Sequence, residues 1–295
     1  MNINKSKFVY PGLYFKNGRL FPKKKFGQNF LTDPELSSLI IKAASLTEND
    51  FVLEIGPGLG ALTVPIANIS KMVFAVERDK DMINLLENEL KNQDIKNVKF
   101  FNKDILKFDI DKEIIRLNEL NSENINNKII VMGNLPYNIS SQIAIKLINE
   151  RKYISKAVLM FQKEMAKRIA ARPGNKDYGR LSVIIQYFAD IEFILEISGK
   201  KFYPRVEVDS EVIMLKFKKN ISFKAVDEKF FFLVVKAAFS QRRKILKNSL
   251  SSGFLPFSSD RIDKALKECE IDSQRRAETL NVNEFVKLSN AFSKS

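Results

Sequence analysis

Apolar runs alternate with helical patterns from about residue 35 to residue 218. Four of these runs have the length and composition of buried strands: Phe51–Ile55, Val73–Val76, Val98–Phe101 and Ile129–Met132. The segments between them fit helices. Alternation of this kind is typical of βαβ units, in which parallel strands form one sheet with helices on both faces. The pattern therefore predicts a doubly wound, Rossmann-like α/β sheet.

The last strands of this sheet follow a different pattern. Ala157–Phe161 fits a fifth strand, and a helix is expected to begin near Lys163. Ile191–Ile197 and Glu211–Phe217 then read as a closing pair of strands, which suits a β-hairpin.

From about residue 220 the pattern is helical to the end of the chain. Apolar residues recur there at heptad-like spacing: Phe232, Val235, Phe239, Leu246 and Leu250. We therefore expect a basic N-terminal extension over residues 1–22, a catalytic α/β domain over residues 23–219 and a small all-helical domain over residues 220–295.

The composition narrows the range of functions. The 295 residues include 49 Lys or Arg and 35 Asp or Glu, which gives a net charge of +14. A chain so basic usually binds a polyanion, most often nucleic acid, although the lysine-rich composition of an AT-rich genome would give the same charge. Cys269 is the single cysteine, and the chain has no histidine. These counts exclude a disulfide framework within the chain, multi-cysteine zinc sites and histidine-based acid–base catalysis.

The chain has no segment of membrane type. A stretch of about 20 apolar residues is absent, and residues 1–31 lack the apolar core of a signal peptide. We expect a cytoplasmic protein that uses no metal and no membrane.

The segment Asn134-Leu135-Pro136-Tyr137 follows a predicted buried strand and suggests chemistry on adenine. The Asn134 side-chain carbonyl and the backbone carbonyl beside Pro136, which has no N–H, can both accept hydrogen bonds from an exocyclic adenine amine. Such bonds would draw the amine lone pair out of conjugation with the ring. Tyr137 offers a flat face to the base, and base–aromatic stacking contributes roughly 1–3 kcal/mol. Taken alone, the tetrapeptide also fits an ordinary strand-to-loop turn with a buried tyrosine.

Three candidate cofactor-binding positions follow three successive predicted strands. The loop Gly56-Pro57-Gly58-Leu59-Gly60 lets the backbone approach a ligand, but its G-x-G-x-G spacing departs from the dinucleotide fingerprint and disfavours NAD. Glu77 ends the second strand, where a carboxylate can bind both hydroxyls of a ribose. Asp104 follows the third strand and can accept a hydrogen bond from the amine of a cofactor adenine, while Ile105 packs on the ring. Each acid alone could be a solvated loop residue, but together the three positions line one sheet edge.

With these motifs, the chain resembles the S-adenosylmethionine-dependent methyltransferases, and among them the ribosomal RNA adenine dimethyltransferases of the KsgA/RsmA type. The resemblance extends from Lys23 nearly to the C-terminus. Six motifs carry it: Phe26-Gly27-Gln28-Asn29-Phe30-Leu31, Glu54-Ile55-Gly56-Pro57-Gly58-Leu59-Gly60, Asp104-Ile105-Leu106, Gly133-Asn134-Leu135-Pro136-Tyr137-Asn138-Ile139-Ser140, Tyr178-Gly179-Arg180-Leu181-Ser182 and Phe239-Ser240-Gln241-Arg242-Arg243-Lys244.

The resemblance implies S-adenosylmethionine as the cofactor. The residues it places around this cofactor are Asn29 and Leu31, which would close over it, Gly56 at its methionine part, Glu77 at its ribose and Asp104 at its adenine. Asn134 would serve both cofactor and target, and Phe202 would stack on the second face of the target base. The implied reaction is dimethylation of two adjacent adenosines near the 3′ end of 16S rRNA in the small ribosomal subunit, by a monomer with a role in subunit biogenesis.

Two features depart from the family pattern. The family loop F-x-P-x-P-K-V-x-S reads F-Y-P-R-V-E-V-D-S from Phe202 to Ser210, so its second proline and its lysine are missing. Glu207 replaces a cation while Arg205 supplies one nearby, which changes how this loop would touch RNA. An N-terminal extension of about twenty residues has no role that the sequence can assign.

Basic segments at both ends of the chain are candidates for RNA contact. Residues 1–31 contain seven Lys or Arg and no acid, which predicts an unneutralised cationic arm beside the cofactor site. Its candidate RNA-binding residues include Lys23, Lys24 and Lys25.

In the helical domain, cations fall at a helical spacing that predicts one basic helix face. The positions at i, i+4, i+7 and i+11 are Lys236, Ser240, Arg243 and Lys247. Spacing alone also fits a solvated helix face, whereas the family's F-S-Q-R-R-K segment favours RNA contact. The candidate RNA-binding residues here are Arg242, Arg243, Lys244 and Lys247.

Three other functions share part of this pattern. A resistance-type methyltransferase of large-subunit (23S) rRNA would have similar catalytic residues, but residues 239–244 within a longer helical domain argue against it. A DNA adenine methyltransferase would more typically carry Asp-Pro-Pro-Tyr or Asn-Pro-Pro-Tyr, and Leu135 departs from both. A non-catalytic ribosome-assembly factor could keep the fold alone, but the retained Glu77, Asp104 and Asn134 argue for a working site.

Overall fold

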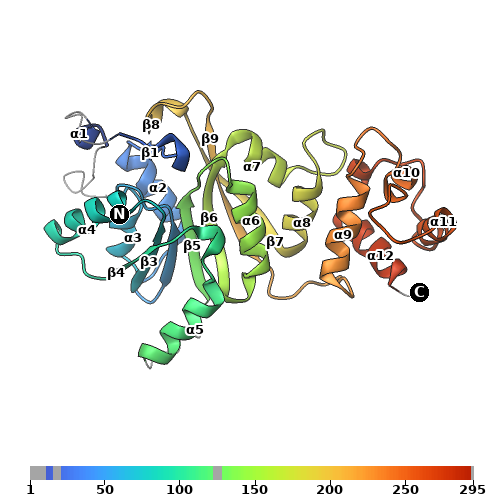
Figure 1. Cartoon of the computed structure of the whole chain (residues 1–295), viewed down its shortest axis with the longest axis horizontal. Helices are drawn as coiled ribbons and strands as arrows, with labels where there is room; N and C mark the ends of the chain where they lie inside the picture. The colour runs from blue at the N-terminus through green and yellow to red at the C-terminus, as the bar shows by residue number, and fades with distance from the viewer. Residues whose placement is uncertain (1–10, 16–20, 122–127, 294–295) are drawn as a thin grey trace. The chain divides into compact units, whose positions relative to one another are not determined.

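The computed structural model describes residues 11–15, 21–121 and 128–293. It has two compact units, each described by itself. The first comprises Met1–Ala166 and Ile191–Phe217, and the second comprises Lys167–Asp190 and Lys218–Ser295 (Figure 1). Residues 167–190 therefore belong to the helical unit, although the sequence placed them in the α/β domain.

The first unit contains a seven-stranded sheet and a separate two-stranded sheet. The strands of the large sheet, in their order across it, are β4 (Val98–Asn102), β3 (Met72–Glu77), β2 (Phe51–Ile55), β5 (Ile129–Asn134), β6 (Ile154–Gln162), β9 (Ser210–Phe217) and β7 (Ala189–Ile197). β4, β3, β2, β5 and β6 pair in parallel, and β9 pairs antiparallel to β6. The predicted Rossmann-like sheet is confirmed, and β7 and β9 are neighbours as expected.

The chain reverses its direction of progress across the sheet between β2 and β5. From β2 it proceeds outward through β3 to β4, and it then returns to β5 on the other side of β2. Open α/β sheets bind ligands beyond the carboxyl ends of the strands at such a switch point. Every residue of β2 and all but the last of β5 are buried, as expected for central parallel strands covered on both faces.

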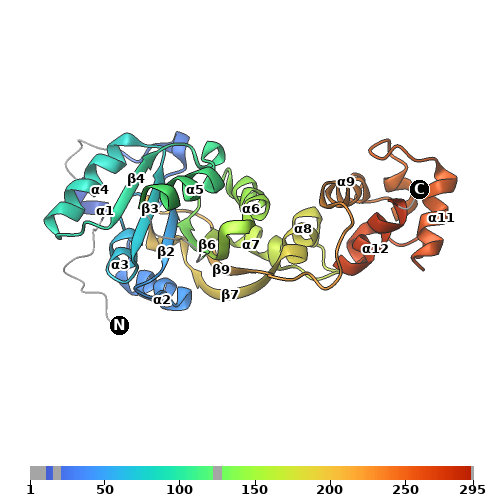
Figure 2. The same ribbon diagram turned by 90° about the horizontal axis from the view of Figure 1, so that it is seen from below.

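Helices cover both faces of the large sheet. They are α2 (Pro34–Ala44), α3 (Thr63–Ala67), α4 (Lys80–Asn92), α5 (Ile110–Asn121), α6 (Ser140–Asn149) and α7 (Lys163–Ala170), the last of which continues into the second unit. α2 and α3 lie on one face, and α5 and α6 lie on the opposite face (Figure 2). Short 3-10 helices occupy loops of this unit: η2 (Lys24–Phe26), η3 (Ile105–Lys107), η4 (Arg151–Tyr153) and η5 (Gly199–Lys201).

Two acidic caps fix where helices begin next to the ligand edge. The Asp79 carboxylate accepts a hydrogen bond from the Asp81 N–H at 3.1 Å and starts α4 directly after β3. The Asp33 carboxylate accepts one from the Glu35 N–H at 2.9 Å and starts α2, whose first residue is Pro34. Both residue types suit these positions, because an N-cap oxygen satisfies an otherwise unpaired N–H and proline is tolerated in the first turn.

The two-stranded sheet joins the N-terminal segment to a loop between β7 and β9. β1 (Phe30–Leu31) pairs antiparallel with β8 (Phe202–Tyr203), so that Phe30 faces Tyr203 and Leu31 faces Phe202. A short helix, α1 (Pro11–Phe15), precedes this sheet in the chain.

The second unit is helical, as predicted. Its helices are α8 (Arg180–Phe188), α9 (Glu228–Ala238), α10 (Leu246–Leu250), α11 (Ser259–Glu268), η6 (Ala277–Thr279) and α12 (Val282–Phe292). α8 packs on α9, and the Tyr187 and Phe231 rings lie 4.7 Å apart there. This packing explains why residues 167–190 belong to the helical unit.

The prediction of one continuous basic helix face through residues 236–247 is wrong. α9 ends at Ala238 and α10 begins only at Leu246, with a turn between them. The Ser240 hydroxyl lies 3.0 Å from the Ser252 hydroxyl, and the Leu246 N–H donates to the Arg275 carbonyl at 2.7 Å. The chain therefore folds back so that α10 packs against α9, which buries Leu246 and Leu250.

Among the residues that the structure describes, none of the helices is long and apolar enough to cross a bilayer.

Candidate functional site

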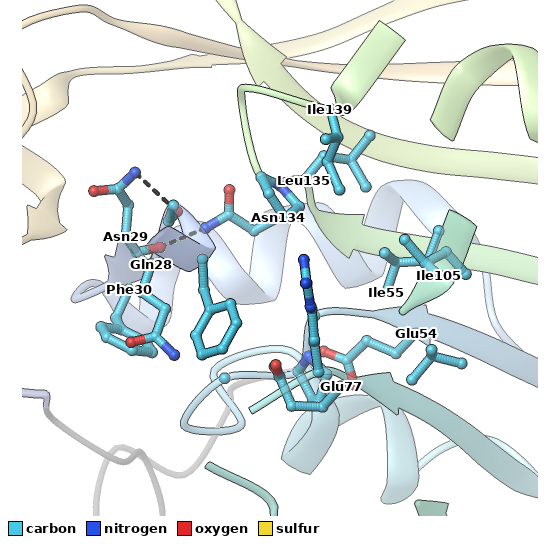
Figure 3. Close-up of a pocket in the computed structure, with 18 of the residues that line it drawn as sticks. Gln28, Asn29, Phe30, Glu54, Ile55, Glu77, Ile105, Asn134, Leu135 and Ile139 are labelled. Atoms are coloured by element: carbon cyan, nitrogen blue, oxygen red, sulfur yellow. Dashed lines mark hydrogen bonds between the residues drawn. The ribbon is translucent and has the colours of Figure 1, made fainter. Parts of the chain in front are cut away.

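A cavity opens at the carboxyl edge of the large sheet, at the switch point between β2 and β5. The loops after four strands line it, and the N-terminal segment through β1 closes its remaining side (Figure 3). The predicted cofactor-binding positions are all among its lining residues: Asn29, Leu31, Gly56, Gly58, Glu77, Asp104, Ile105 and Asn134. Leu135 and Pro136 also line the cavity, whereas Tyr137 and Phe202 are not among its lining residues.

Two glycines make the cavity possible because other residues would not fit. A Cβ atom on Gly58 would lie 3.0 Å from Cε1 of the Phe30 ring, and Gly58 also has a φ of +54°. A Cβ atom on Gly133 would lie 2.5 Å from the Ile55 carbonyl oxygen. Glycine therefore lets β1 approach the loop after β2, and it lets β5 approach β2 immediately before Asn134.

Glu77 is held in one orientation at the end of β3. Its Oε1 accepts a hydrogen bond from the Asp79 N–H at 2.8 Å. Burial raises the pKa of the Glu77 carboxyl, and backbone N–H groups, including those of Asp79 and Gly58, oppose this rise. A carboxylate fixed in this way suits recognition of neighbouring hydroxyl groups such as those of a ribose.

Asp104 caps a 3-10 helix and also lines the cavity. Its Oδ1 accepts a hydrogen bond from the Leu106 N–H at 3.0 Å and caps η3, and its Oδ2 lies 3.5 Å from Nη1 of Arg78. The side chain of Ile105 is buried beside it at the cavity wall. The cap fixes the carboxylate at the strand end, next to the apolar surface that a flat ring would need.

Asn134 presents a buried acceptor that nothing in the described part of the protein satisfies. Its amide nitrogen donates to the Asn29 carbonyl at 2.7 Å (Figure 3). Its Oδ1 is buried and has no hydrogen-bond partner among the described residues. Leaving a buried acceptor unpaired costs roughly 1–3 kcal/mol, so this oxygen is available to accept a hydrogen bond from a bound group.

Glu54 is a cavity residue to which the sequence reasoning gave no role. It lies in β2 with 1% of its surface exposed and lines the cavity. Its Oε2 has no hydrogen-bond partner among the described residues. Burial raises the pKa of this carboxyl to about 8; the neighbouring Thr63 hydroxyl opposes the rise and the charge of Glu77 adds to it. The sequence signal was a single acid within the otherwise apolar strand Phe51–Ile55.

The two expected base-stacking rings differ in their surroundings. Tyr137 is partly buried, and its hydroxyl lies 2.8 Å from the Ser210 hydroxyl. Burial raises the pKa of Tyr137, and the contact with Ser210 opposes that rise. Phe202 is 3% exposed and packs in the core with Leu31. The expected exposed face of Phe202 is therefore absent, because β8 pairs with β1 and its register turns this ring inward.

Of the predicted unneutralised arm, the structure describes the side chains of Lys23 and Lys25, and Lys23 is neutralised. Lys23 Nζ lies 2.7 Å from Asp79 and 2.6 Å from Asp81, so two carboxylates neutralise it. Lys25 is exposed and lines the cavity, with its Nζ 4.9 Å from the centre of the Phe26 ring. The side chain of Lys24 and the cations Lys5, Lys7, Lys16 and Arg19 lie outside the described residues.

Of the candidate RNA-binding cations in the second unit, two contact carboxylates and two are exposed. Lys247 lies 2.6 Å from Asp263, and Arg242 lies 3.5 Å from Glu278. Arg243 and Lys244 are exposed in the turn between α9 and α10. The loss of the continuous helix therefore leaves a short basic turn in place of a basic helix face.

The chain is similar to known proteins along nearly its whole length. A family model described as ribosomal RNA adenine dimethylase matches residues 21–294. The protein named Ribosomal RNA small subunit methyltransferase A from Desulforapulum autotrophicum is 46% identical over 283 residues, covering 96% of each chain.

Two solved structures share the fold of this chain. A dimethyladenosine transferase from Plasmodium falciparum has a TM-score of 0.76 at 26% identity, covering 90% of this chain and 98% of that one. The 23S rRNA methyltransferase ErmE has a TM-score of 0.65 at 23% identity, covering 90% of this chain and 99% of that one. The second likeness shows the fold alone.

Proposed function

Because the chain belongs to the ribosomal RNA adenine dimethylase family, we propose that it dimethylates two adjacent adenosines near the 3′ end of small-subunit (16S) rRNA. It is a methyltransferase of the class I fold, and its methyl donor is S-adenosylmethionine. The proposed substrate is the rRNA within the small ribosomal subunit, and the enzyme would act as a monomer in subunit biogenesis. That substrate would place the protein in the cytoplasm.

The observation that carries this proposal is the unpaired Oδ1 of Asn134. An adenine amine placed in the cavity would donate to this oxygen, and the bond from the Asn134 amide to Asn29 sets which way the oxygen points. The Pro136 carbonyl accepts from the Ile139 N–H at 3.1 Å, which makes the Leu135 carbonyl the candidate for a second bond. Two acceptors would pull the amine lone pair out of conjugation and toward the methyl donor.

The cavity residues fit S-adenosylmethionine in their chemistry. Glu77 would hold the ribose hydroxyls, Asp104 and Ile105 would hold the adenine, and the backbone at Gly56 would face the methionine part. When bound, the cofactor supplies a sulfonium methyl group for transfer. The chain's own part is to bind, orient and exclude water, since positioning and electrostatic complementarity can carry such a transfer.

The target adenine needs a stacking partner and a route for its proton. Tyr137 keeps the proposed stacking role, whereas Phe202 could take it only if the β8 segment moved, because its ring is buried. The amine becomes acidic as it gains the methyl group, so water can accept its proton without a histidine base. After one transfer the amine keeps one hydrogen, and in a second round this hydrogen would be donated to one of the two acceptors.

The comparisons favour the small-subunit substrate over the large-subunit one. The relative named for small-subunit rRNA is 46% identical along 96% of the chain, whereas the likeness to the 23S enzyme is confined to the fold. The retained Glu77, Asp104 and Asn134, which line one cavity, argue against a purely non-catalytic assembly factor.

Methyl transfer to purified subunits tests this proposal. The protein is incubated with labelled S-adenosylmethionine and with small or large subunits from cells that lack these methylations, and the labelled bases are then mapped. We expect two adjacent dimethyladenosines near the 3′ end of the small-subunit rRNA. Label chiefly in large subunits would overturn the substrate assignment, and no label in either would overturn the activity.

A further inference from the structure

Phe15 is buried although it precedes the part of the chain that the family match covers. Its side chain is 5% exposed. Its ring stacks on Tyr203, with centroids 5.3 Å apart and planes 9° from parallel, and it lies 5.4 Å from the Phe30 ring. Leu59 and Met82 complete the apolar cluster. An aromatic residue from the N-terminal extension is therefore part of the core at this edge of the first unit.

The two rings that Phe15 contacts belong to the two strands of the small sheet. Phe30 of β1 faces Tyr203 of β8 in the antiparallel pair. β1 ends the segment Gly27–Leu31, which lines the cavity, and the Phe30 ring also packs where a Cβ atom on Gly58 would lie. Phe15 thus packs on both strands, whose pairing covers two residues and is continued by the Thr32 N–H, which donates to the Lys201 carbonyl at 2.9 Å. A pairing this short has little stability of its own.

A set of polar contacts fixes the N-terminal segment on α4 and at its N-cap. The Tyr14 hydroxyl donates to Glu89 of α4 at 3.0 Å. Lys23 Nζ and Gln28 Nε2 donate to the two oxygens of Asp79 at 2.7 and 2.8 Å. The Asp79 N–H in turn donates to Glu77, the carboxylate assigned to the ribose. The segment from Tyr14 to Leu31 is therefore anchored at each of its described parts, and it ends at the cavity.

We propose that Phe15 is a positioning residue that clamps β1 against β8 and so keeps the segment Gly27–Leu31 closed over the cofactor. The extension then contributes to S-adenosylmethionine affinity without touching the reacting atoms. The proposed function enters this inference only by naming the ligand. Apparent affinity falls in proportion to the fraction of molecules that are closed, so a tenfold smaller closed fraction raises the apparent Kd about tenfold.

Calorimetry and hydrogen exchange on the full chain test the clamp. Phe15→Ala is compared with Phe21→Ala, a matched control in the same segment whose side chain is 70% exposed. We expect Phe15→Ala to raise the Kd for S-adenosylmethionine and for S-adenosylhomocysteine about tenfold, and Phe21→Ala to leave both unchanged. Without ligand, amides of residues 23–31 and 200–206 should exchange faster in Phe15→Ala, while those of β5 should keep their protection. Phe15→Leu, which keeps an apolar side chain, should recover most of the affinity.

The kinetic pattern separates positioning from a general loss of structure. A clamp predicts a raised KM for S-adenosylmethionine with a small change in kcat, whereas partial unfolding lowers kcat at constant KM and exposes β5 to exchange. If Phe15→Ala does not fold, Tyr203→Leu removes the same stacked pair and takes its place. Wild-type Kd and exchange in the folded variant would overturn the clamp. Failure of the unmodified chain to bind S-adenosylmethionine would instead overturn the proposed function.

Discussion

The Asn134 amide nitrogen donates a hydrogen bond to the Asn29 carbonyl oxygen across 2.7 Å. This bond joins the end of β5 to the N-terminal segment over the cavity. It also fixes the orientation of the Asn134 amide, because the nitrogen is engaged and Oδ1 remains without a partner among the described residues. The same hydrogen bond therefore links the N-terminal segment to the orientation of the proposed amine acceptor.

Replacing Asn134 should strongly slow methyl transfer. Asn134→Ala removes the oxygen that would accept from the target amine, and we expect single-turnover rates to fall by about 10²–10³, the usual cost of losing one positioned partner of a transition state. Asn248→Ala, at an exposed position of α10, serves as the control and should keep the wild-type rate. Circular dichroism should show the same fold in both. A near-wild-type rate for folded Asn134→Ala would refute amine activation by this side chain.

Removing the strand-end acids should weaken cofactor binding. Glu77→Ala and Asp104→Ala should each lower S-adenosylmethionine affinity by about 1–3 kcal/mol if each leaves a buried partner unpaired. RNA binding should change little. Glu87→Ala on the exposed face of α4 is the matched control. Calorimetry that gives wild-type affinity for both cavity variants would contradict their assignment.

The buried Glu54 should make stability depend on pH. Its folded pKa of about 8 lies above the ordinary value of 4.5, so between these values the unfolded chain releases a proton that the folded chain retains. The free energy of unfolding should therefore fall as pH rises from about 4.5 to about 8, by at most ~1.4 kcal/mol per pH unit for this group. Below this window the contribution of Glu54 is fully present.

Urea unfolding at pH 5 and pH 8 measures this effect. Glu54→Gln cannot ionise, so it should lose less stability between the two pH values than the wild type does. Glu87→Gln should keep the wild-type difference, because Glu87 is exposed on α4. Equal pH dependence in the wild type and Glu54→Gln would show that the carboxyl already ionises in the folded chain at low pH.

Cations of the turn between α9 and α10 should contact RNA phosphates. Arg243→Gln and Lys244→Gln should each weaken binding to small subunits, and each lost phosphate contact should lower the log–log salt slope by about 0.7–0.9. Lys267→Gln, also exposed in the second unit, is the control. Unchanged slopes in both turn variants would exclude this turn from the RNA interface.

Lys247 should behave differently from these two neighbours. Its ammonium group pairs with Asp263. Lys247→Met should therefore lower the thermal stability of the chain and leave the salt slope of RNA binding nearly unchanged. Thermal unfolding and salt-dependent binding of the same preparation separate the two effects. A reduced slope with unchanged stability would show that the ion pair opens to RNA.

The strands could be predicted because central parallel strands are continuous apolar runs; Phe51–Ile55 is reproduced without change as β2. The ligand edge followed from Glu77 and Asp104, which stand where two such strands end. The sequence around a residue does not indicate which distant segment will pair with it in a sheet or an ion pair. The register that buries Phe202 depends on β1, and the partner of Lys23 is Asp79. Helical spacing also continued across residues 239–245, because periodicity cannot detect a turn that tertiary hydrogen bonds create.

The small sheet affects the stage of the chain's own synthesis at which the cavity can first bind the methyl donor. Phe30 emerges early and Tyr203 late, and each is the strand partner of the other. A nascent chain can therefore form the glycine loop and the ends of β3 and β5 well before the wall over them can close. If the proposed clamp holds, a chain that ends before Tyr203 lacks the strand partner of Phe30 and should bind the methyl donor less tightly than the full chain.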